Sequence, residues 1–420
     1  MINIPQENFE AAYPRFNDNR DYYEGRVEKA AGMYRKTFKD NASVRIFSAP
    51  GRTEIGGNHT DHQHGCVLAA AIDMDILAAA AENGTNVIRI LSEGYKMVEI
   101  DIMNLKPVKE EENTSSAIIR GVAAGLAKEG YNIKGFNMYA VSSVLKGSGL
   151  SSSAAFEVIV GTVMNGLFCG GAVDSVKIAQ IGQFAENVYF GKPSGLMDQM
   201  ASSVGNIVAI DFKDTDNPVV KKIDFDFSKA GYALCIIDSG ADHADLTPEY
   251  AAIPKEMKEV ASYFGKEVLR ETDINSVLEN AADIRDKFGD RAFMRAVHFF
   301  DDNERALKEA EYLQNGNFDE FLNTIRQSGY SSFMYLQNVS VCGSDREQAV
   351  AYVLCLCHAF LKDKGAYRVH GGGFAGTVQA FVPSELVGSF KEKIEKAVGK
   401  GCCHVLSIRA MGGAELTSKK

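Results

Sequence analysis

The N-terminal part of the chain changes from a helical to an extended hydrophobic pattern near residue 40. A helix is predicted over residues 20–39 by apolar side chains three or four positions apart, namely Tyr23, Val27, Ala30, Tyr34 and Phe38. Short apolar runs that are typical of strands follow at residues 44–48, 67–77, 87–91 and 97–102. We therefore expect an amphipathic helix followed by β-structure.

Beyond residue 102, predicted helices and strands are mixed without a regular order. Helices are predicted at 116–128, 152–168 and 175–189 and between 249 and 361, and strands at 136–144, 207–212, 233–238, 377–382 and 405–410. Such mixing favours an α+β fold over a doubly wound sheet. The chain of 420 residues is long for one hydrophobic core, and the polar run 213–217 before Pro218 is the best candidate linker. We therefore expect two domains, residues 1–215 and residues 216–420.

Composition and charge narrow the possible partners. A net charge of −10 repels phosphate backbones, so we expect no nucleic-acid partner, and an anion such as ATP must be held by local donors and a metal. The most apolar helix-like stretch, 154–173, carries Glu157 and Asn165, and the N-terminus lacks the pattern of a signal peptide. The eight cysteines show no paired CxxC spacing and are expected to be free thiols. We expect a cytoplasmic protein without a membrane partner, either a monomer or a weak homo-oligomer.

A loop rich in glycine and serine is the most informative local motif. Residues 144–155 read VLKGSGLSSSAA, which leaves a predicted strand, turns at Gly147 and Gly149, and enters a predicted helix. Unpaired N–H groups at a helix N-terminus bind phosphate readily, and serine hydroxyls can add hydrogen bonds or a magnesium ligand. The sequence fits neither standard nucleotide fingerprint. A serine-capped helix after a glycine turn remains the alternative interpretation.

Two further segments carry candidate chemistry. Residues 48–65 read SAPGRTEIGGNHTDHQHG, and the spacing of their histidines does not favour a metal site. Arg52, His59 and Asp61 instead suit a ligand rich in hydroxyl groups, although a solvated loop is also compatible with the pattern. Residues 370–381 read HGGGFAGTVQAF, where Gly371–Gly373 let a ligand or another segment pack against bare backbone, or form a tight turn.

Together these segments resemble the GHMP kinases and, within them, the galactokinases. PGRTEIGGNHTDHQHG is similar to the galactokinase signature, KGSGLSSSAA to the ATP-binding second motif of the family, and HGGGFAGTV to its third motif. The segment AENVYFGKPSGLMDQ resembles the one that carries the catalytic acid. The order and approximate spacing of these motifs hold over nearly the whole chain.

The resemblance implies an N-terminal domain like domain 2 of ribosomal protein S5, a ferredoxin-like C-terminal domain, and an active site in the cleft between them. It implies transfer of the γ-phosphate of ATP to the anomeric C1 hydroxyl of galactose, with Mg²⁺ as cofactor. Asp198 matches the catalytic aspartate and Arg52 the arginine beside it, while Ser153 and Glu186 match the magnesium ligands. The implied phosphate-binding residues are Gly147, Ser148, Gly149, Leu150, Ser151, Ser152 and Ser153, and the implied sugar-binding residues are Asn58, His59, Asp61, Gly195 and Tyr250.

One departure from the family pattern leaves the sugar open. Galactokinases usually read GEHTDY where this chain reads GNHTDH, so Asn58 replaces a glutamate that contacts the far end of the sugar ring. A neutral amide there could accept galacturonate or L-arabinose, and N-acetylgalactosamine is a further alternative substrate. A sensor that binds galactose and ATP without phosphoryl transfer is a second alternative.

Overall fold

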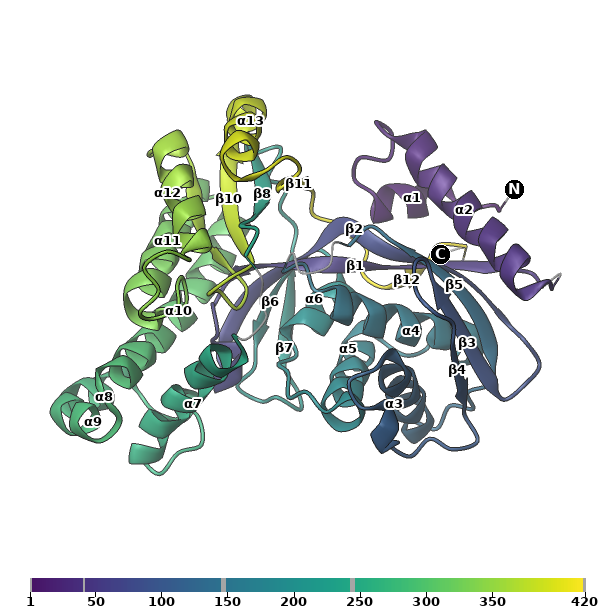
Figure 1. The fold of residues 1–420 in the computed structure, drawn as a ribbon, viewed down its shortest axis with the longest axis horizontal. Helices are drawn as coiled ribbons and strands as arrows, with labels where there is room; N and C mark the ends of the chain where they lie inside the picture. The colour runs from purple at the N-terminus through teal and green to yellow at the C-terminus, as the bar shows by residue number, and fades with distance from the viewer. Residues whose placement is uncertain (1, 41, 145–148, 242–245, 418–420) are drawn as a thin grey trace.

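The computed structural model describes residues 2–40, 42–144, 149–241 and 246–417, and these parts of the chain form two β-sheets. Figure 1 shows the larger sheet running across the molecule, with the smaller sheet standing at one end of it. The larger sheet has eight strands in the order β12-β1-β2-β5-β3-β4, with β6 pairing with β2 and β7 with β6. Its strands are β1 (Arg45–Gly56), β2 (Cys66–Glu82), β3 (Val87–Ser92), β4 (Val98–Asp101), β5 (Phe136–Ser142), β6 (Ile207–Asp211), β7 (Val219–Ile223) and β12 (Ala414–Glu415).

Helices cover both faces of the larger sheet, because its central strands are apolar on both sides. On β2, Ala78 and Ala80 belong to one core, whereas Leu77 and Ala79 belong to the other, as the alternation of side chains along a strand requires. In Figure 1, α1 and α2 lie above this sheet and α3 to α6 below it. The bounds are α1 (Gln6–Ala12), α2 (Arg20–Phe38), α3 (Ser115–Lys128), α4 (Ser152–Phe168), α5 (Ser175–Phe184) and α6 (Met197–Val204).

The smaller sheet is antiparallel, in the order β11-β8-β10-β9. Its strands are β8 (Tyr232–Asp238), β9 (Ala366–His370), β10 (Thr377–Pro383) and β11 (Cys403–Leu406). One face packs on α12 and α13, and the side chains of Leu234 and Phe381 join a core that also contains Ile55 and Leu68 of the larger sheet. The remaining helices are α7 (Thr247–Tyr263), α8 (Ile274–Glu279), α9 (Ala281–Phe288), α10 (Asp290–Asn315), α11 (Phe318–Ser331), α12 (Ala349–Leu361) and α13 (Val387–Val398).

The predicted α+β architecture is confirmed, and α4 has the predicted bounds. The helix predicted over 175–189 is α-helical only to Phe184 and continues as a π-helical turn over Ala185–Phe190. The run 213–217 is not a linker: it is the turn of the hairpin between β6 and β7, so the chain stays in the larger sheet beyond it. The division at residue 215 stays a prediction, and β12 returns the C-terminal end of the chain to β1.

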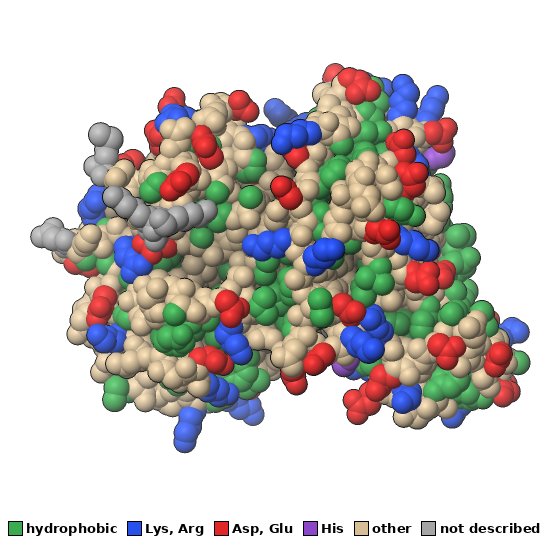
Figure 2. All heavy atoms as spheres, turned by 180° about the vertical axis from the view of Figure 1, so that it is seen from behind, with side chains coloured by type: hydrophobic (Ala, Val, Ile, Leu, Met, Phe, Trp, Pro, Cys, Tyr) green, Lys and Arg blue, Asp and Glu red, His purple; other side chains and the backbone are tan. Residues whose placement is uncertain are grey.

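Acidic and basic side chains are interspersed on the face shown in Figure 2, so this face presents no large patch of one charge to a partner. In the described parts of the chain, no helix combines the length and the apolar character needed to cross a membrane. The absence of a nucleic-acid partner stays a prediction from the net charge.

Candidate active site

Asp198 and Arg52 form a bidentate ion pair where strand β1 meets helix α6. Arg52 Nε donates to Asp198 Oδ1 at 2.6 Å and Nη2 donates to Oδ2 at 2.8 Å. Ser151, just before α4, donates its hydroxyl to the same Oδ2 at 2.6 Å. The Arg52 side chain is 8% exposed and that of Asp198 is 30% exposed, so the carboxylate remains partly accessible. The structure thus joins two sequence-predicted catalytic residues with one from the glycine-rich loop.

The environment of Asp198 keeps it ionised. Burial by itself would raise its pKa, but the Arg52 guanidinium and the Ser151 hydroxyl outweigh this effect and leave the pKa below its usual value. A carboxylate with three hydrogen bonds to its oxygens is a weak base before reaction and a good group for orienting a hydroxyl.

The end of the glycine-rich loop is anchored by its carbonyl groups. Arg52 Nη1 donates to the carbonyl of Gly149, and the Arg52 N–H donates to that of Leu150 at 3.0 Å. The Leu150 side chain is fully buried, so only its backbone can serve a ligand. Ser151 has a left-handed φ of 55°, which turns the chain into α4 at Ser152. The predicted phosphate-loop residues Gly147 and Ser148 lie outside the described residues.

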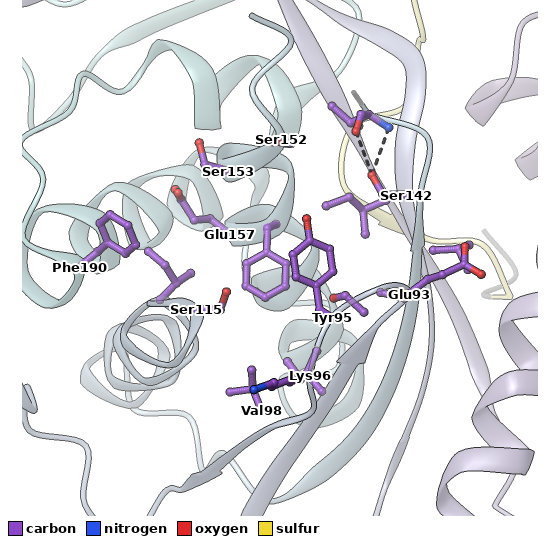
Figure 3. Close-up of a pocket in the computed structure, with 18 of the residues that line it drawn as sticks. Glu93, Tyr95, Lys96, Val98, Ser115, Ser142, Ser152, Ser153, Glu157 and Phe190 are labelled. Carbon is purple, nitrogen blue, oxygen red and sulfur yellow. Dashed lines mark hydrogen bonds between the residues drawn. The ribbon is translucent and has the colours of Figure 1, made fainter. Parts of the chain in front are cut away.

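A cavity of about 610 Å³ opens beside the start of α4. Figure 3 shows Ser153 and Glu157 of α4 directed toward it, with Phe190, Tyr95 and Val98 around it. This volume lies in the range of small-molecule sites, which is about 300–1,000 Å³. The apolar lining residues are Ile76, Ile90, Val98, Ile118, Ala140, Val141, Val144, Phe156 and Phe190, and the polar ones are Ser92, Glu93, Tyr95, Lys96, Ser115, Ser142, Ser152, Ser153, Glu157 and Glu186.

The predicted magnesium ligand Glu186 lies near a second buried carboxylate, Glu157. Glu186 receives Lys192 Nζ at 3.2 Å, and Gln199 Nε2 donates both to Glu186 Oε2 at 2.9 Å and to Glu157 Oε2 at 2.8 Å. Burial and then the neighbouring Glu186 raise the pKa of Glu157 well above its usual value, and Glu157 Oε1 has no hydrogen-bond partner. Magnesium commonly takes one or two protein oxygens and completes its shell with phosphate and water, so Ser153 and Glu186 fit this ion.

Two of the predicted sugar-binding residues, Gly195 and Asp61, lie against each other, and a third, His59, contacts the glycine cluster. A Cβ on Gly195 would lie 2.2 Å from Asp61 Oδ2, so only glycine leaves room for this carboxylate. His59 Nε2 lies 3.0 Å from the carbonyl of Gly372, and because a carbonyl only accepts, Nε2 carries the proton. Burial lowers the pKa of His59 to about 3, so the imidazole is neutral and its Nδ1 is an acceptor. These groups can both accept from and orient hydroxyl groups.

Tyr250 and Asn58 complete the predicted sugar-binding set, and they differ in accessibility. Tyr250 lies half-buried on α7 and donates its hydroxyl to the carbonyl of Gly373 at 2.8 Å. Asn58 is fully buried, and Nδ2 donates both to Glu54 Oε1 at 2.9 Å and to the carbonyl of Gly371 at 2.7 Å. The role of Asn58 in binding a sugar directly stays a prediction.

Family comparisons agree with this geometry. Residues 33–82 match the model described as the galactose-binding signature of galactokinases, and residues 117–206 match the N-terminal domain of GHMP kinases. The two matches contain Arg52 and Asp198, the residues that form the ion pair. The chain is similar to the galactokinases of the GHMP kinase family.

Individual relatives of this protein point to the same family. A galactokinase of Glaesserella parasuis is 29% identical over 364 residues, which are 84% of this chain and 89% of that protein. The structure of Lactococcus lactis galactokinase complexed with galactose superimposes with a TM-score of 0.78 at 24% identity, covering 93% of this chain and 99% of the other. Methanococcus jannaschii mevalonate kinase gives a TM-score of 0.60 at 16% identity over 88% of this chain and 99% of its own. At these identities, the two structures show the shared fold.

Sequence reasoning missed several residues of the site in this kinase. Gln199, which bridges the two buried carboxylates, directly follows Asp198 but has no signature of its own. Tyr95 and Lys96 reach the cavity from the turn between β3 and β4, a segment without any motif. Glu54 lies within the histidine-rich stretch, and only its burial beside Arg368 singles it out.

Proposed function

We propose that this protein transfers the γ-phosphate of ATP to the anomeric C1 hydroxyl of galactose, giving galactose 1-phosphate and ADP. The observation that carries the proposal is the Asp198–Arg52 pair, joined at 2.6 and 2.8 Å, together with the Ser151 hydroxyl just before α4 that donates to the same carboxylate. With the nucleotide bound beside α4 and the sugar bound at Asp61 and His59, Asp198 would contact the acceptor hydroxyl and Arg52 the phosphoryl group.

Asp198 would orient the C1 hydroxyl and accept its proton late in the reaction. Its lowered pKa makes it a poor base toward an ordinary sugar hydroxyl. The hydroxyl becomes strongly acidic only as its oxygen bonds to phosphorus, and the loose transition state of phosphoryl transfer needs little deprotonation before that point. Arg52 would offset the charge on the transferring phosphoryl group while holding Asp198 in place.

The nucleotide would bind along the N-terminal end of α4. The unpaired N–H groups of this 17-residue helix carry the partial positive charge that favours phosphate, and the apolar cavity walls suit a purine ring. Ser153 and Glu186 would hold magnesium, which neutralises phosphate charge when bound. This local arrangement supports ATP binding by a chain of net charge −10.

A coupled assay of ADP release with ATP, Mg²⁺ and a sugar panel tests the proposal. The panel contains galactose, galacturonate, L-arabinose, N-acetylgalactosamine and glucose, and phosphorus NMR reads whether the product is esterified at C1. We expect turnover to be highest with galactose. If only another sugar is turned over, that sugar is the substrate. If galactose and ATP bind without turnover, the protein is a sensor and the kinase proposal is wrong.

The pH dependence of kcat/KM should reveal how Arg52 lowers the pKa of Asp198. Because the folded pKa of Asp198 lies below its usual value, Asp198 loses its charge only in strong acid, and it contributes no acid limb to kcat/KM near neutral pH. In Arg52→Gln, burial acts without the opposing cation, so this limb should move to higher pH. Stopped assays between pH 4 and 9 on both proteins check this shift. An unchanged limb in Arg52→Gln would contradict the assigned electrostatics.

A substitution in the cavity beside α4 should change the affinity for the nucleotide without changing the affinity for the sugar. Val98 lies half-buried on the edge strand β4 and lines the cavity. Val98→Glu places a carboxylate against the bound nucleotide, and we expect the KM for ATP to rise about tenfold, or ~1.4 kcal/mol, with an unchanged KM for galactose. Val219→Glu, at a residue that is 69% exposed on β7, is the matched control. Equal effects of both substitutions would move the nucleotide site elsewhere.

A further inference from the structure

The glycine cluster forms a ladder of hydrogen-bond acceptors under the sugar side of the site. The first carbonyl of Gly371–Gly373 accepts from Asn58 Nδ2 at 2.7 Å, the second from His59 Nε2 at 3.0 Å, and the third from the Tyr250 hydroxyl at 2.8 Å. Asn338 Nδ2 also donates to the second carbonyl, at 3.2 Å. The adjacent residues Asn58 and His59 and the distant Tyr250 are therefore held by three consecutive peptide groups.

The conformation of this ladder needs its glycines. The first and third glycines have left-handed φ angles of 68° and 84°. A Cβ on Gly373 would lie 2.0 Å from the carbonyl oxygen of Asn338, and a Cβ on Gly372 would lie 2.6 Å from Cε1 of Tyr250. The backbone therefore approaches its neighbours more closely than any side chain would allow. The third sequence motif is thus explained by packing on the sugar side.

The hydrogen-bonding groups of Asn58 are occupied by the protein. Both amide protons are donated, to Glu54 Oε1 and to the first glycine carbonyl, and Oδ1 accepts from Asn338 Nδ2 at 2.8 Å. Its backbone N–H donates to Asp302 Oδ2 at 2.8 Å, and its carbonyl lies 3.1 Å from His298 Nε2. The residue is 0% exposed. Contact with a sugar hydroxyl would break one of these buried hydrogen bonds, which is costly.

His59 and Asp61, which follow Asn58 in the chain, remain partly accessible. His59 has a left-handed φ of 62°, a conformation that is unusual for a side-chain-bearing residue and depends on its surroundings. The hydrogen bonds of Asn58 fix the backbone on one side of this strained residue, and the second glycine carbonyl fixes its ring. Weaker hydrogen bonds to the Gly371–Gly373 carbonyls would therefore free the His59 ring to move.

We propose that Asn58 is a positioning residue: it holds the Gly371–Gly373 carbonyls in place, and these carbonyls orient His59 and Tyr250. In this role Asn58 does not itself contact the C6 end of the sugar. This inference rests on the proposed sugar kinase function. Loss of the Asn58 hydrogen bonds should lower the affinities for galactose and L-arabinose by the same factor. The two sugars differ only in the C6 group, which a direct contact from Asn58 would recognise.

Asn58→Ala, compared with wild type and with Ser332→Ala, tests this proposal in the full-length protein. Ser332 donates to Asn58 Oδ1 at 3.4 Å and is buried, but the structure records no hydrogen bond from it to the glycine segment. Hydrogen–deuterium exchange of residues 368–376 should rise only in Asn58→Ala, and calorimetry should show both sugar affinities falling about tenfold. Unchanged exchange, or a galactose-to-arabinose affinity ratio that shifts more than threefold, would overturn the positioning role.

A second variant keeps the proposal testable if Asn58→Ala does not fold. Gly372→Ala adds one methyl group against the Tyr250 ring without requiring a left-handed residue to change. It should lower both sugar affinities equally and leave the KM for ATP unchanged, whereas an affinity loss for galactose alone would overturn the ladder. If wild type binds no sugar of the panel, the proposed function fails, and the exchange measurement still decides whether Asn58 locks the glycine segment.

Discussion

Asp198→Asn should lower kcat by at least about 10³-fold while the KM values for ATP and galactose change little. The amide keeps the shape of the side chain and one acceptor oxygen, but it can neither take the proton of the C1 hydroxyl nor balance the charge of Arg52. The Arg52 guanidinium, 8% exposed, then loses its anionic partner. The effect therefore falls on the transition state, where both proton and charge are moving. The coupled ADP assay at saturating substrates measures it.

The matched control for this variant is Asp211→Asn. Asp211 also forms an ion pair with an arginine, Arg270, at 2.8 Å, but on β6 and away from the cavity beside α4. The Asp211→Asn variant should retain nearly the full wild-type kcat, and circular dichroism should show that both variants are folded. If Asp198→Asn kept more than a tenth of the wild-type kcat, Asp198 would be a structural partner of Arg52, and the catalytic assignment would be wrong.

Asn58→Glu, which restores the usual galactokinase residue, should destabilise this chain by roughly 3–5 kcal/mol. The new carboxylate would be fully buried at the hydrogen-bonding distance, 2.9 Å, that now joins Asn58 Nδ2 to Glu54. It would also face the carbonyl of Gly371, which needs a donor. Urea denaturation followed by fluorescence or circular dichroism gives the change in unfolding free energy.

The double variant Glu54→Gln with Asn58→Glu separates charge from shape. It again leaves one carboxylate and one amide in the pair, with Arg368 beside them as the cation. We expect about half of the lost stability to return, because the carbonyl of Gly371 still lacks its donor. Asn17→Glu is the exposed control, since Asn17 also donates to a glutamate, Glu10, at 3.5 Å, and we expect a change below ~0.5 kcal/mol there. A double variant no more stable than Asn58→Glu would contradict the charge argument.

Local patterns determined much of the secondary structure. Helix α4 has the predicted bounds because its apolar residues and its entry through three serines are both local signals. Strands β2 and β8 also lie where apolar runs predicted them. The helix predicted over 175–189 was incomplete, because the π-helical turn at Ala185–Phe190 depends on packing against α3, which no local pattern records. The turn at 213–217 was misread as a linker, because polar turns inside a hairpin and between domains have the same composition.

The motifs predicted a catalytic region, and the tertiary structure decided what each of its residues contacts. Arg52 and Asp198 are 146 positions apart in sequence, and only the meeting of β1 with α6 gives the paired hydrogen bonds that set the charge of the carboxylate. Asn58 stood out in sequence as a change at the sugar, but folding buries it against Glu54 and the glycine cluster, where its amide serves the protein. Sequence alone determines which groups are present. Burial and long-range pairing decide which of them remain available to a ligand, because a buried polar group must find its partner within the fold.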